Sequence, residues 1–386
     1  MSYCWKGIEK LESLIVRSVA CDTSEVEPKN SAVALPSRAR SAKPISLKEL
    51  AKQLNLSPTS LSLVLNGSPA AASIPKATQD LIFTAAKKFN YRPNFLARSL
   101  RVRRTYVVGV LGPELSEGYY SLVLSGVEEF LTSVGYMYLA TSHRHDEKLI
   151  EENTSLLWER GVDGIIAVGT SLRRVPQWLR MVSVSGHEPI PGVTNVILNH
   201  NSAADLGLRH LVELGHREIA VIKGQSFSSD TDIRFQAMQR AASDLGLSIP
   251  SSCVAQLEGT SPYPDTGYVA AQKLLAAGGS FTALLSFNDI SAIGAMRAFR
   301  EAGLGVPEDV SVVGFDDIAA AAYHNPPLTT IRQPLRKMGM IAAEILVKRL
   351  AGEMDEFGDS FQVEPDLVLR ESTARVPVTT RKRRAP

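Results

Sequence analysis

The chain has 386 residues, enough for two or three folded domains, and its 44% share of hydrophobic residues is ordinary for a globular protein. With 42 basic and 40 acidic residues, its net charge of +2 points to no particular partner. The three cysteines, Cys4, Cys21 and Cys253, lie far apart without CxxC spacing, which argues against a disulfide framework or a zinc site and favours a reducing cytoplasm.

The first 43 residues mix polar, Pro and Ala residues without sustained periodicity, which predicts a disordered N-terminal extension over residues 1–43. Charged side chains interrupt the first 20 residues, and no apolar run approaches the roughly 18 residues that a membrane-spanning helix needs. We therefore expect no signal peptide, no membrane contact and a cytoplasmic location.

Positive charge is concentrated in the region that follows this extension. Residues 44–104 contain ten basic and two acidic side chains, so the rest of the chain is net acidic. Such a split between regions favours contact with nucleic acid or another anionic surface.

Two short helices are predicted at the start of this basic region. Ser46 followed three residues later by Glu49 is a capping box, and apolar residues then recur at helical spacing from Leu47. Ser57 and Pro58 predict the start of a second helix after a tight turn. Such a pair matches a helix-turn-helix with a recognition helix, and a plain αα-hairpin is the alternative on spacing alone.

From residue 106 onward, strand patterns alternate with helical patterns, which indicates parallel α/β sheets covered on both faces. The predicted strands cover residues 106–111, 136–140, 164–168, 180–184, 195–198, 218–222, 283–287, 310–314 and 367–369. The predicted helices cover residues 121–134, 147–160, 203–214, 233–245, 265–277, 290–302 and 334–350. Two successive groups of this kind favour two lobes over one oversized sheet.

Segments spread over residues 45–372 resemble the lactose and purine repressor family of bacterial transcription regulators. They are ISLKELAKQLNLSPTSLSLVLNG (45–67), AAKKFNYRPNFLARSL (85–100), GVDGIIAV (161–168), ELGHREIAVI (213–222), FNDISAIGAMRA (287–298), VPEDVSVVGFDD (306–317) and PPLTTIRQPLRKMG (326–339). The resemblance favours the helix-turn-helix interpretation. It implies an effector-controlled regulator, most commonly a repressor, that binds double-stranded operator DNA as a homodimer or a tetramer.

The fold that the resemblance implies is a small all-α helix-turn-helix head plus an α/β periplasmic-binding-protein-like body of two doubly wound lobes, with crossovers near residues 200, 330 and 362. The expected domains are the head at 44–92, a hinge helix and linker at 93–104, a first lobe at 105–200 with 331–361, a second lobe at 201–330 with 362–373, and a basic tail at 374–386.

For DNA binding, the resemblance implies contacts by Ser57, Pro58, Thr59, Ser62, Leu63, Asn66, Tyr91, Asn94, Ala97, Arg98 and Leu100. Leu100 matches the position that wedges between base steps in the minor groove, and an ordinary core leucine is the alternative. Leu63 stands where the family often has Arg or His, so a bidentate guanine contact is absent, and Pro58 donates no hydrogen bond. About three residues are also inserted within 68–73, and the operator sequence stays open.

For the effector, the resemblance implies a cleft lined by Tyr119, Tyr120, Arg234, Asn288, Asp289, Asp316 and Gln333. Tyrosine rings, an arginine and carboxylates suit a hydroxyl-rich ligand, so a sugar or sugar derivative is expected. Alternatives remain: Asp316 with Asp317 as a helix cap, Arg234 as a surface residue, and Asn288 with Asp289 as an N-cap pair that also binds ligand. The chain departs from the family at Asn199-His200, Gly118 and Ala237.

Catalysis finds no support in the motifs, because no nucleophile elbow, Walker loop, HExxH or strand-linked GxGxxG is present. The polar cluster at residues 143–146 does not have metal-ligand spacing and is expected to be a loop. We therefore expect no enzyme activity, cofactor or metal. The rival functions are a free-standing sugar-binding protein without a DNA role and, more remotely, a sugar-processing enzyme.

Overall fold

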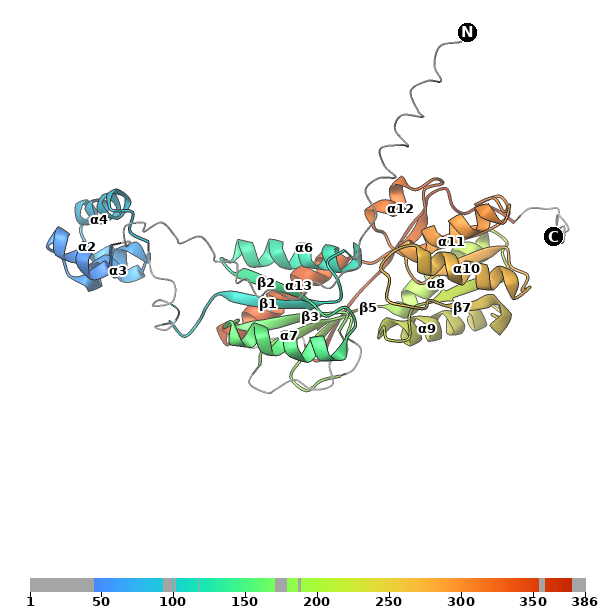
Figure 1. Cartoon of the computed structure of the whole chain (residues 1–386), viewed down its shortest axis with the longest axis horizontal. Coiled ribbons are helices and arrows are strands. Elements are labelled where there is room, and N and C mark those ends of the chain that lie inside the picture. Colours follow the sequence, from blue (N-terminus) through green and yellow to red (C-terminus); the bar gives the residue numbers. More distant parts are fainter. Residues whose placement is uncertain are drawn as a thin grey trace, which may run out of the picture. The chain divides into compact units, whose positions relative to one another are not determined.

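The computed structural model describes residues 45–92, 99, 102–116, 118–170, 179–186, 189–353 and 358–376. The chain divides into two compact units, Met1–Phe95 and Leu96–Pro386 (Figure 1). The predicted N-terminal extension, the four-residue basic run in the C-terminal tail and most of the predicted hinge helix lie outside the described residues. No helix among the described residues is long and apolar enough to cross a membrane.

In the described part of the first unit, residues 45–92, three α-helices surround a small apolar core. They are α2 (Leu47–Leu54), α3 (Pro58–Leu65) and α4 (Lys76–Lys88). The predicted capping box is confirmed: the Ser46 hydroxyl accepts from the Glu49 amide at 3.2 Å, and the Glu49 carboxylate accepts from the Ser46 amide at 2.8 Å. The inserted segment forms a 3-10 turn, Pro69–Ser73, which Gln79 of α4 holds by donating to the carbonyl of Ala71 at 3.0 Å.

The first lobe of the second unit is a six-stranded sheet in which every pairing is parallel. Its order is β11-β5-β4-β3-β1-β2, from β1 (Val107–Gly112), β2 (Met137–Ser142), β3 (Gly164–Val168), β4 (Met181–Val184), β5 (Thr194–Leu198) and β11 (Ser360–Val363). Helices α6 (Gly118–Ser133) and α13 (Leu335–Ala351) cover one face, and α7 (Glu147–Glu159) covers the other (Figure 1).

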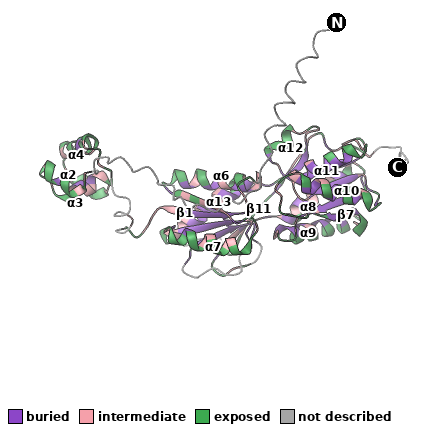
Figure 2. Ribbon diagram, in the orientation of Figure 1, coloured by how far each residue is buried: buried purple, intermediate pink, exposed green. Residues whose placement is uncertain are grey.

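The second lobe repeats this plan. Its sheet order is β12-β10-β9-β8-β6-β7, from β6 (Ile219–Lys223), β7 (Val254–Gln256), β8 (Ala283–Ser286), β9 (Ser311–Asp316), β10 (Thr329–Arg332) and β12 (Asp366–Val368), where β12 alone runs antiparallel. Its helices are α8 (His200–Glu213), α9 (Asp230–Asp244), α10 (Asp265–Ala276), α11 (Asp289–Glu301) and the short α12 (Ala319–Tyr323). Figure 2 shows buried strands between helices with exposed outer sides in both lobes.

In each lobe two neighbouring helices approach backbone to backbone at a glycine. A Cβ on Gly126 of α6 would lie 1.9 Å from the carbonyl oxygen of Arg336 in α13. A Cβ on Gly294 of α11 would lie 1.9 Å from the carbonyl oxygen of Pro264, which precedes α10. No side chain fits at either place, so both helix pairs are packed without spare room.

The chain passes between the two sheets three times. The first passage lies between β5 and α8 at Asn199, the second between β10 and α13 at residues 333–334, and the third between β11 and β12 at residues 364–365. Asn199 donates from its amide nitrogen to both carboxylate oxygens of Glu364, at 3.0 and 3.1 Å. This bond joins the first passage to the third.

The predicted strands and helices are confirmed within a few residues, but β7, β10 and β11 were missed. These strands are three or four residues long and mix polar with apolar residues, so they show neither a continuous apolar run nor a long enough alternation. Helices α8 and α9 each begin three residues earlier than predicted. As a result His200 and Asp230 occupy the first turns of these helices, next to the cleft described below.

Candidate functional site

The head exposes the face of α3 that the resemblance assigns to DNA. Ser57 caps the helix by accepting from the Ser60 amide at 3.0 Å, and Pro58, Thr59 and Asn66 are exposed. The structure therefore leaves the start of this helix open to a partner. The remaining predicted residues of the head, Ser62, Leu63 and Tyr91, are half-buried, and Tyr91 packs against the core of the head.

The predicted hinge contacts cannot be placed in the same way. Asn94, Ala97, Arg98 and Leu100 lie outside the described residues. Their roles therefore stay predictions from the resemblance.

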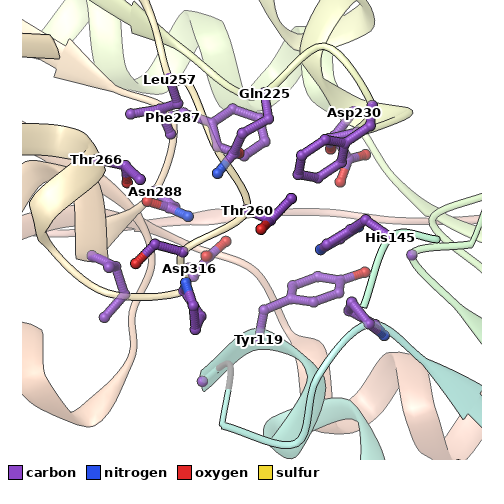
Figure 3. A pocket seen from close by; sticks show the side chains of 18 of the residues that line it. Tyr119, His145, Gln225, Asp230, Leu257, Thr260, Thr266, Phe287, Asn288 and Asp316 are labelled. Atoms are coloured by element: carbon purple, nitrogen blue, oxygen red, sulfur yellow. The ribbon is translucent and has the colours of Figure 1, made fainter. Parts of the chain in front are cut away.

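The body contains a cleft between its two lobes, at the carboxyl ends of strands from both sheets (Figure 3). Open α/β sheets bind ligands at these strand ends. The first lobe contributes Pro113, Gly118, Tyr119, His145 and Gly169. The second lobe contributes a longer set that includes Gln225, Phe227, Asp230, Arg234, Thr260, Phe287, Asn288 and Asp316, and Gln333 lies at the second passage.

The space within the cleft suits a small molecule. Its cavity volume is about 110 Å³, whereas a single buried water needs only about 10–15 Å³. Because both lobes line this space, a ligand here would contact the two lobes together.

Arg234 is held rigidly in the second lobe. Its guanidinium carbon lies 3.7 Å from the ring centre of Phe315 and 4.5 Å from that of Phe287. One terminal nitrogen donates to the Phe287 carbonyl at 2.5 Å, and the other lies 3.6 Å from the carboxylate of Asp230. Arg234 is only 3% exposed, so the alternative of a surface residue is wrong. Its Nε is buried and has no hydrogen-bond partner within the described residues, so this donor is unsatisfied in the structure.

Asp316 ends strand β9 in an unusual backbone conformation. Its φ is 108° and that of Asp317 is 58°, values that non-glycine residues rarely adopt and that cluster at functional sites. Gln333 donates to Asp316 at 2.5 Å, while the Gln333 amide oxygen is buried without a partner among the described residues. Burial raises the pKa of Asp316 to about 8, although Arg234 opposes this shift. Asp316 is therefore placed to exchange hydrogen bonds with a ligand.

Asp317, unlike Asp316, has a structural role in the second lobe. It pairs with Arg332 at 2.7 Å and with Arg370 at 2.5 Å. These bonds hold the end of strand β9 in place. Capping by Asp316 is not observed, because Ile318 occupies the N-cap of the next helix.

Two predicted cleft residues need correction, because the structure places neither of them on the cleft wall. Tyr120 is fully buried in the core of the first lobe, where its ring fills the space beside Gly112. Asp289 is also fully buried, and it accepts from the Ile318 amide at 2.9 Å and from the Thr330 hydroxyl at 2.5 Å. Burial raises the pKa of Asp289 to about 7.

Asn288 combines both of its proposed roles in the structure, as a cap and as part of the cleft wall. Its side-chain oxygen caps α11 by accepting from the Ser291 amide at 2.9 Å, and the residue also lines the cleft. Tyr119, from the first turn of α6, lies near Asp230 and Asp316. Burial raises the pKa of Tyr119 well above its ordinary value, and the nearby Asp230 adds to the shift, so its hydroxyl stays protonated.

Several cleft residues were missed by sequence reasoning. His145 of the first lobe stacks on Phe227 of the second, with ring centres 4.1 Å apart. Both residues follow strand ends, and this position was the signal that could have revealed them. The segment 143–146 is a turn, as expected, but His143 is buried and bonds to Thr170 at 3.0 Å, and burial lowers its pKa to about 4.

Asp230 and His200 form a second missed contact, at the back of the cleft. The His200 Nε2 lies 3.3 Å from a carboxylate oxygen of Asp230, and both side chains are largely buried. Throughout the described part of the chain, no group of three or more His, Cys, Asp or Glu residues is placed to hold a metal ion.

Comparison with known proteins agrees with this architecture. Residues 208–373 match the family model of periplasmic-binding-protein-like domains. The chain is 31% identical to the HTH-type transcriptional repressor PurR of Haemophilus influenzae over 343 residues, which cover 86% of this chain and 99% of that protein. It is 32% identical to PurR of Aliivibrio fischeri over 337 residues, which cover 84% of this chain and 97% of that protein.

Solved structures give a similar result. The lac repressor dimer bound to operator and the anti-inducer ONPF superposes with a TM-score of 0.74 at 25% identity, over 86% of this chain and all of that chain. The transcriptional regulator CelR in complex with cellobiose gives a TM-score of 0.63 at 27% identity, over 85% of this chain and 99% of that chain.

Proposed function

The chain belongs to the lactose and purine repressor family of transcription regulators, and we propose that it is a repressor whose DNA binding is controlled by a small hydroxyl-rich effector, such as a sugar, in the cleft. The observation that carries this proposal is the pairing of two features in one chain. A helix-turn-helix head exposes the start of α3, and a cleft presents polar side chains from both lobes.

The side chains of the cleft support a hydroxyl-rich effector. Arg234 has a free donor, Gln333 has a free acceptor, and Asp316 offers a carboxyl group whose raised pKa lets it donate or accept. A sugar carries many hydroxyl groups that both donate and accept, so it can satisfy all three residues at once. The aromatic surfaces of Tyr119 and Phe227 would cover the apolar faces of a sugar ring.

Control of DNA binding follows from the position of the cleft. A ligand that contacts both lobes favours one angle between them, and it can change DNA affinity only by as much as its affinities for the two angles differ. We further propose that residues 93–104 form the hinge that links the head to this change, with Leu100 wedged between base steps. A homodimer would place two heads on a near-palindromic operator. Such a protein would act in the cytoplasm, where the DNA lies.

A binding titration with the DNA upstream of the gene tests the proposal. Fluorescence anisotropy of a duplex containing a near-palindrome should show tight binding that weakens with salt, by a slope on the order of several log units per log unit of salt, because each head neutralises several phosphates. A panel of neutral sugars, amino sugars and purine bases is then added. A salt slope below about two, or no response to any panel member, would contradict the proposal.

The variant Leu100→Ala separates this function from that of a sugar-binding protein without a DNA role. We expect it to weaken operator binding much more than binding to an unrelated duplex, since only the operator complex uses the kink. A sugar-binding protein without a DNA role would show a sugar response and equally weak binding to both duplexes.

A further inference from the structure

His200 occupies a junction that the family pattern does not explain. It is the first residue of α8, directly after Asn199 at the first passage between the sheets, and it is 6% exposed. Asn199 is tied to Glu364 of the third passage. A displacement of the His200 ring would therefore move the backbone of the first passage and, through Asn199, that of the third.

The ring of His200 reaches from this passage to the residues that line the cleft. Its Nε2 lies 3.3 Å from one carboxylate oxygen of Asp230, and the other oxygen of Asp230 lies 3.6 Å from Arg234. All three side chains are largely buried, so the contact is little screened by water. A buried carboxylate is costly unless it has partners, and these two partners fix its position.

The first lobe meets the same junction. Ser229, the residue before Asp230, donates from its hydroxyl to the carbonyl of Ser185 in the first lobe at 2.8 Å. Tyr119, also of the first lobe, lies close enough to Asp230 for the carboxylate to raise its pKa further. Asp230 thus lies where the first lobe, the arginine of the cleft and the passage come together.

We propose that His200 is a positioning residue that holds Asp230 against Arg234 and so links the occupancy of the cleft to the angle between the lobes. This inference rests on the proposed function, since it assigns His200 to the control of the same cleft. A ligand that binds Arg234 and shifts its guanidinium also shifts Asp230. Through the contact of Asp230 with His200, it then shifts the first passage at Asn199. Without the ring, Asp230 keeps Arg234 but loses its link to the passage, and the lobe angle is less restricted.

The lobe angle can be measured without DNA or effector. Spin labels are attached at Glu151→Cys in α7 and Arg300→Cys in α11, two exposed positions on opposite lobes. Cys4 and Cys21 are replaced by serine, and Cys253 stays because it is buried and will not react. The labelled full-length chain is diluted with unlabelled protein, so that label pairs within one chain dominate the distances measured by double electron–electron resonance.

We expect His200→Ala to widen the distribution of label distances about twofold. Asp230→Asn should widen it similarly, and the double variant should be no wider than either single one, because both changes break the same contact. His200→Gln should restore the parent width, since its amide can donate to Asp230. The control is His210→Ala on the same helix, whose ring bonds instead to Thr373.

An unchanged distribution in His200→Ala would overturn the proposal, and so would equal widening in His210→Ala. If His200→Ala does not fold, the other two variants test the proposal. The distribution of label distances must then be as narrow as in the parent for His200→Gln and wider than in the parent for Asp230→Asn. Failure of the proposed function is seen separately. In that case the label distances respond to the variants as expected, but no small molecule changes DNA binding by the parent protein.

Discussion

The two lobes share an architecture but differ in chemistry. Each has six strands in an equivalent order, helices on both faces and a glycine contact between two neighbouring helices. Among the described residues, the buried charged side chains on the cleft wall, Asp230, Arg234 and Asp316, all come from the second lobe. The first lobe contributes aromatic rings, glycines and a proline.

This difference indicates a division of labour on a common scaffold. Polar side chains that are fixed before binding give orientation and specificity to a ligand, and these belong to the second lobe. Tyr119 and His145 of the first lobe line the opposite side of the cleft, where they would cover a ligand. We therefore expect substitutions in the second lobe to alter effector binding far more than those in the first.

The largest effect is expected for Arg234→Ala. Removing the guanidinium leaves the buried Asp230 without its cation, which should lower the free energy of unfolding by about 3–5 kcal/mol. The response to the effector found in the sugar and purine panel should be abolished, while the effector-free protein binds the operator within about tenfold of the parent. Urea unfolding and anisotropy titrations measure the two effects.

The matched control for this change is Arg240→Ala, an exposed arginine on the same helix that bonds to Asn201. Arg240→Ala should leave the free energy of unfolding and the response to the effector nearly unchanged. If the effector is instead required for DNA binding, Arg234→Ala will not bind the operator at all. A full effector response in Arg234→Ala would show that the second lobe does not read the ligand.

The next largest effect tests the feature that the lobes share. Gly126→Ala and Gly294→Ala each place a methyl group against a main-chain oxygen, which cannot move aside as a side chain can. We expect each to lower the free energy of unfolding by about 1–3 kcal/mol. Gly207→Ala, whose nearest neighbour would be a leucine side chain at 3.3 Å, should cost less. Equal costs at all three sites would mean that the helix pairs have room to shift.

A third prediction concerns pH. The pKa of Asp316 is raised from 3.8 to about 8, so the folded state holds a proton that the unfolded state releases. Stability should therefore fall as pH rises between about 4 and 8. Asp316→Asn should flatten this dependence in urea titrations, although Asp289 will keep part of it. The exposed Asp244→Asn serves as the control, and an identical slope in parent and Asp316→Asn would contradict the burial argument.

The smallest effect is expected in the first lobe. Tyr119→Phe removes one hydroxyl and keeps the ring, so effector affinity should fall by only about 0.5–1.5 kcal/mol, or a few-fold. Operator binding without effector should not change. A loss as large as that of Arg234→Ala would remove the proposed difference between the lobes.

The head and the body were not equally predictable from sequence. The start of each predicted head helix depends on neighbouring residues, such as Ser46 with Glu49, so local rules were sufficient. The cleft depends on residues far apart in the chain, and only the resemblance brought Tyr119, Arg234 and Asp316 together. The structure confirms that these three line the same cleft, Tyr119 from the first lobe and Arg234 and Asp316 from the second, but their contact with an effector stays a prediction.

The errors have a physical cause. Consecutive helical residues point about 100° apart, so Tyr119 faces the cleft while Tyr120 enters the core. At the start of α11 the cause is different: Asn288 is the N-cap, with an extended backbone, and lines the cleft, whereas Asp289 begins the helix and is buried. The contact between His200 and Asp230 joins two helices whose first turns were not predicted, so no pattern in the sequence could reveal it.

The glycine contacts have a mechanical consequence. Helices that touch at their backbones resist sliding. We therefore expect each lobe to turn as a stiff arm, with bending confined to the three passages. A stiff arm amplifies motion, because a small rotation near the cleft becomes a displacement that grows with distance from the pivot. The chain enters the body at the far end of β1, and six residues of strand span about 20 Å. The point that leads to the head thus lies at the long end of this lever.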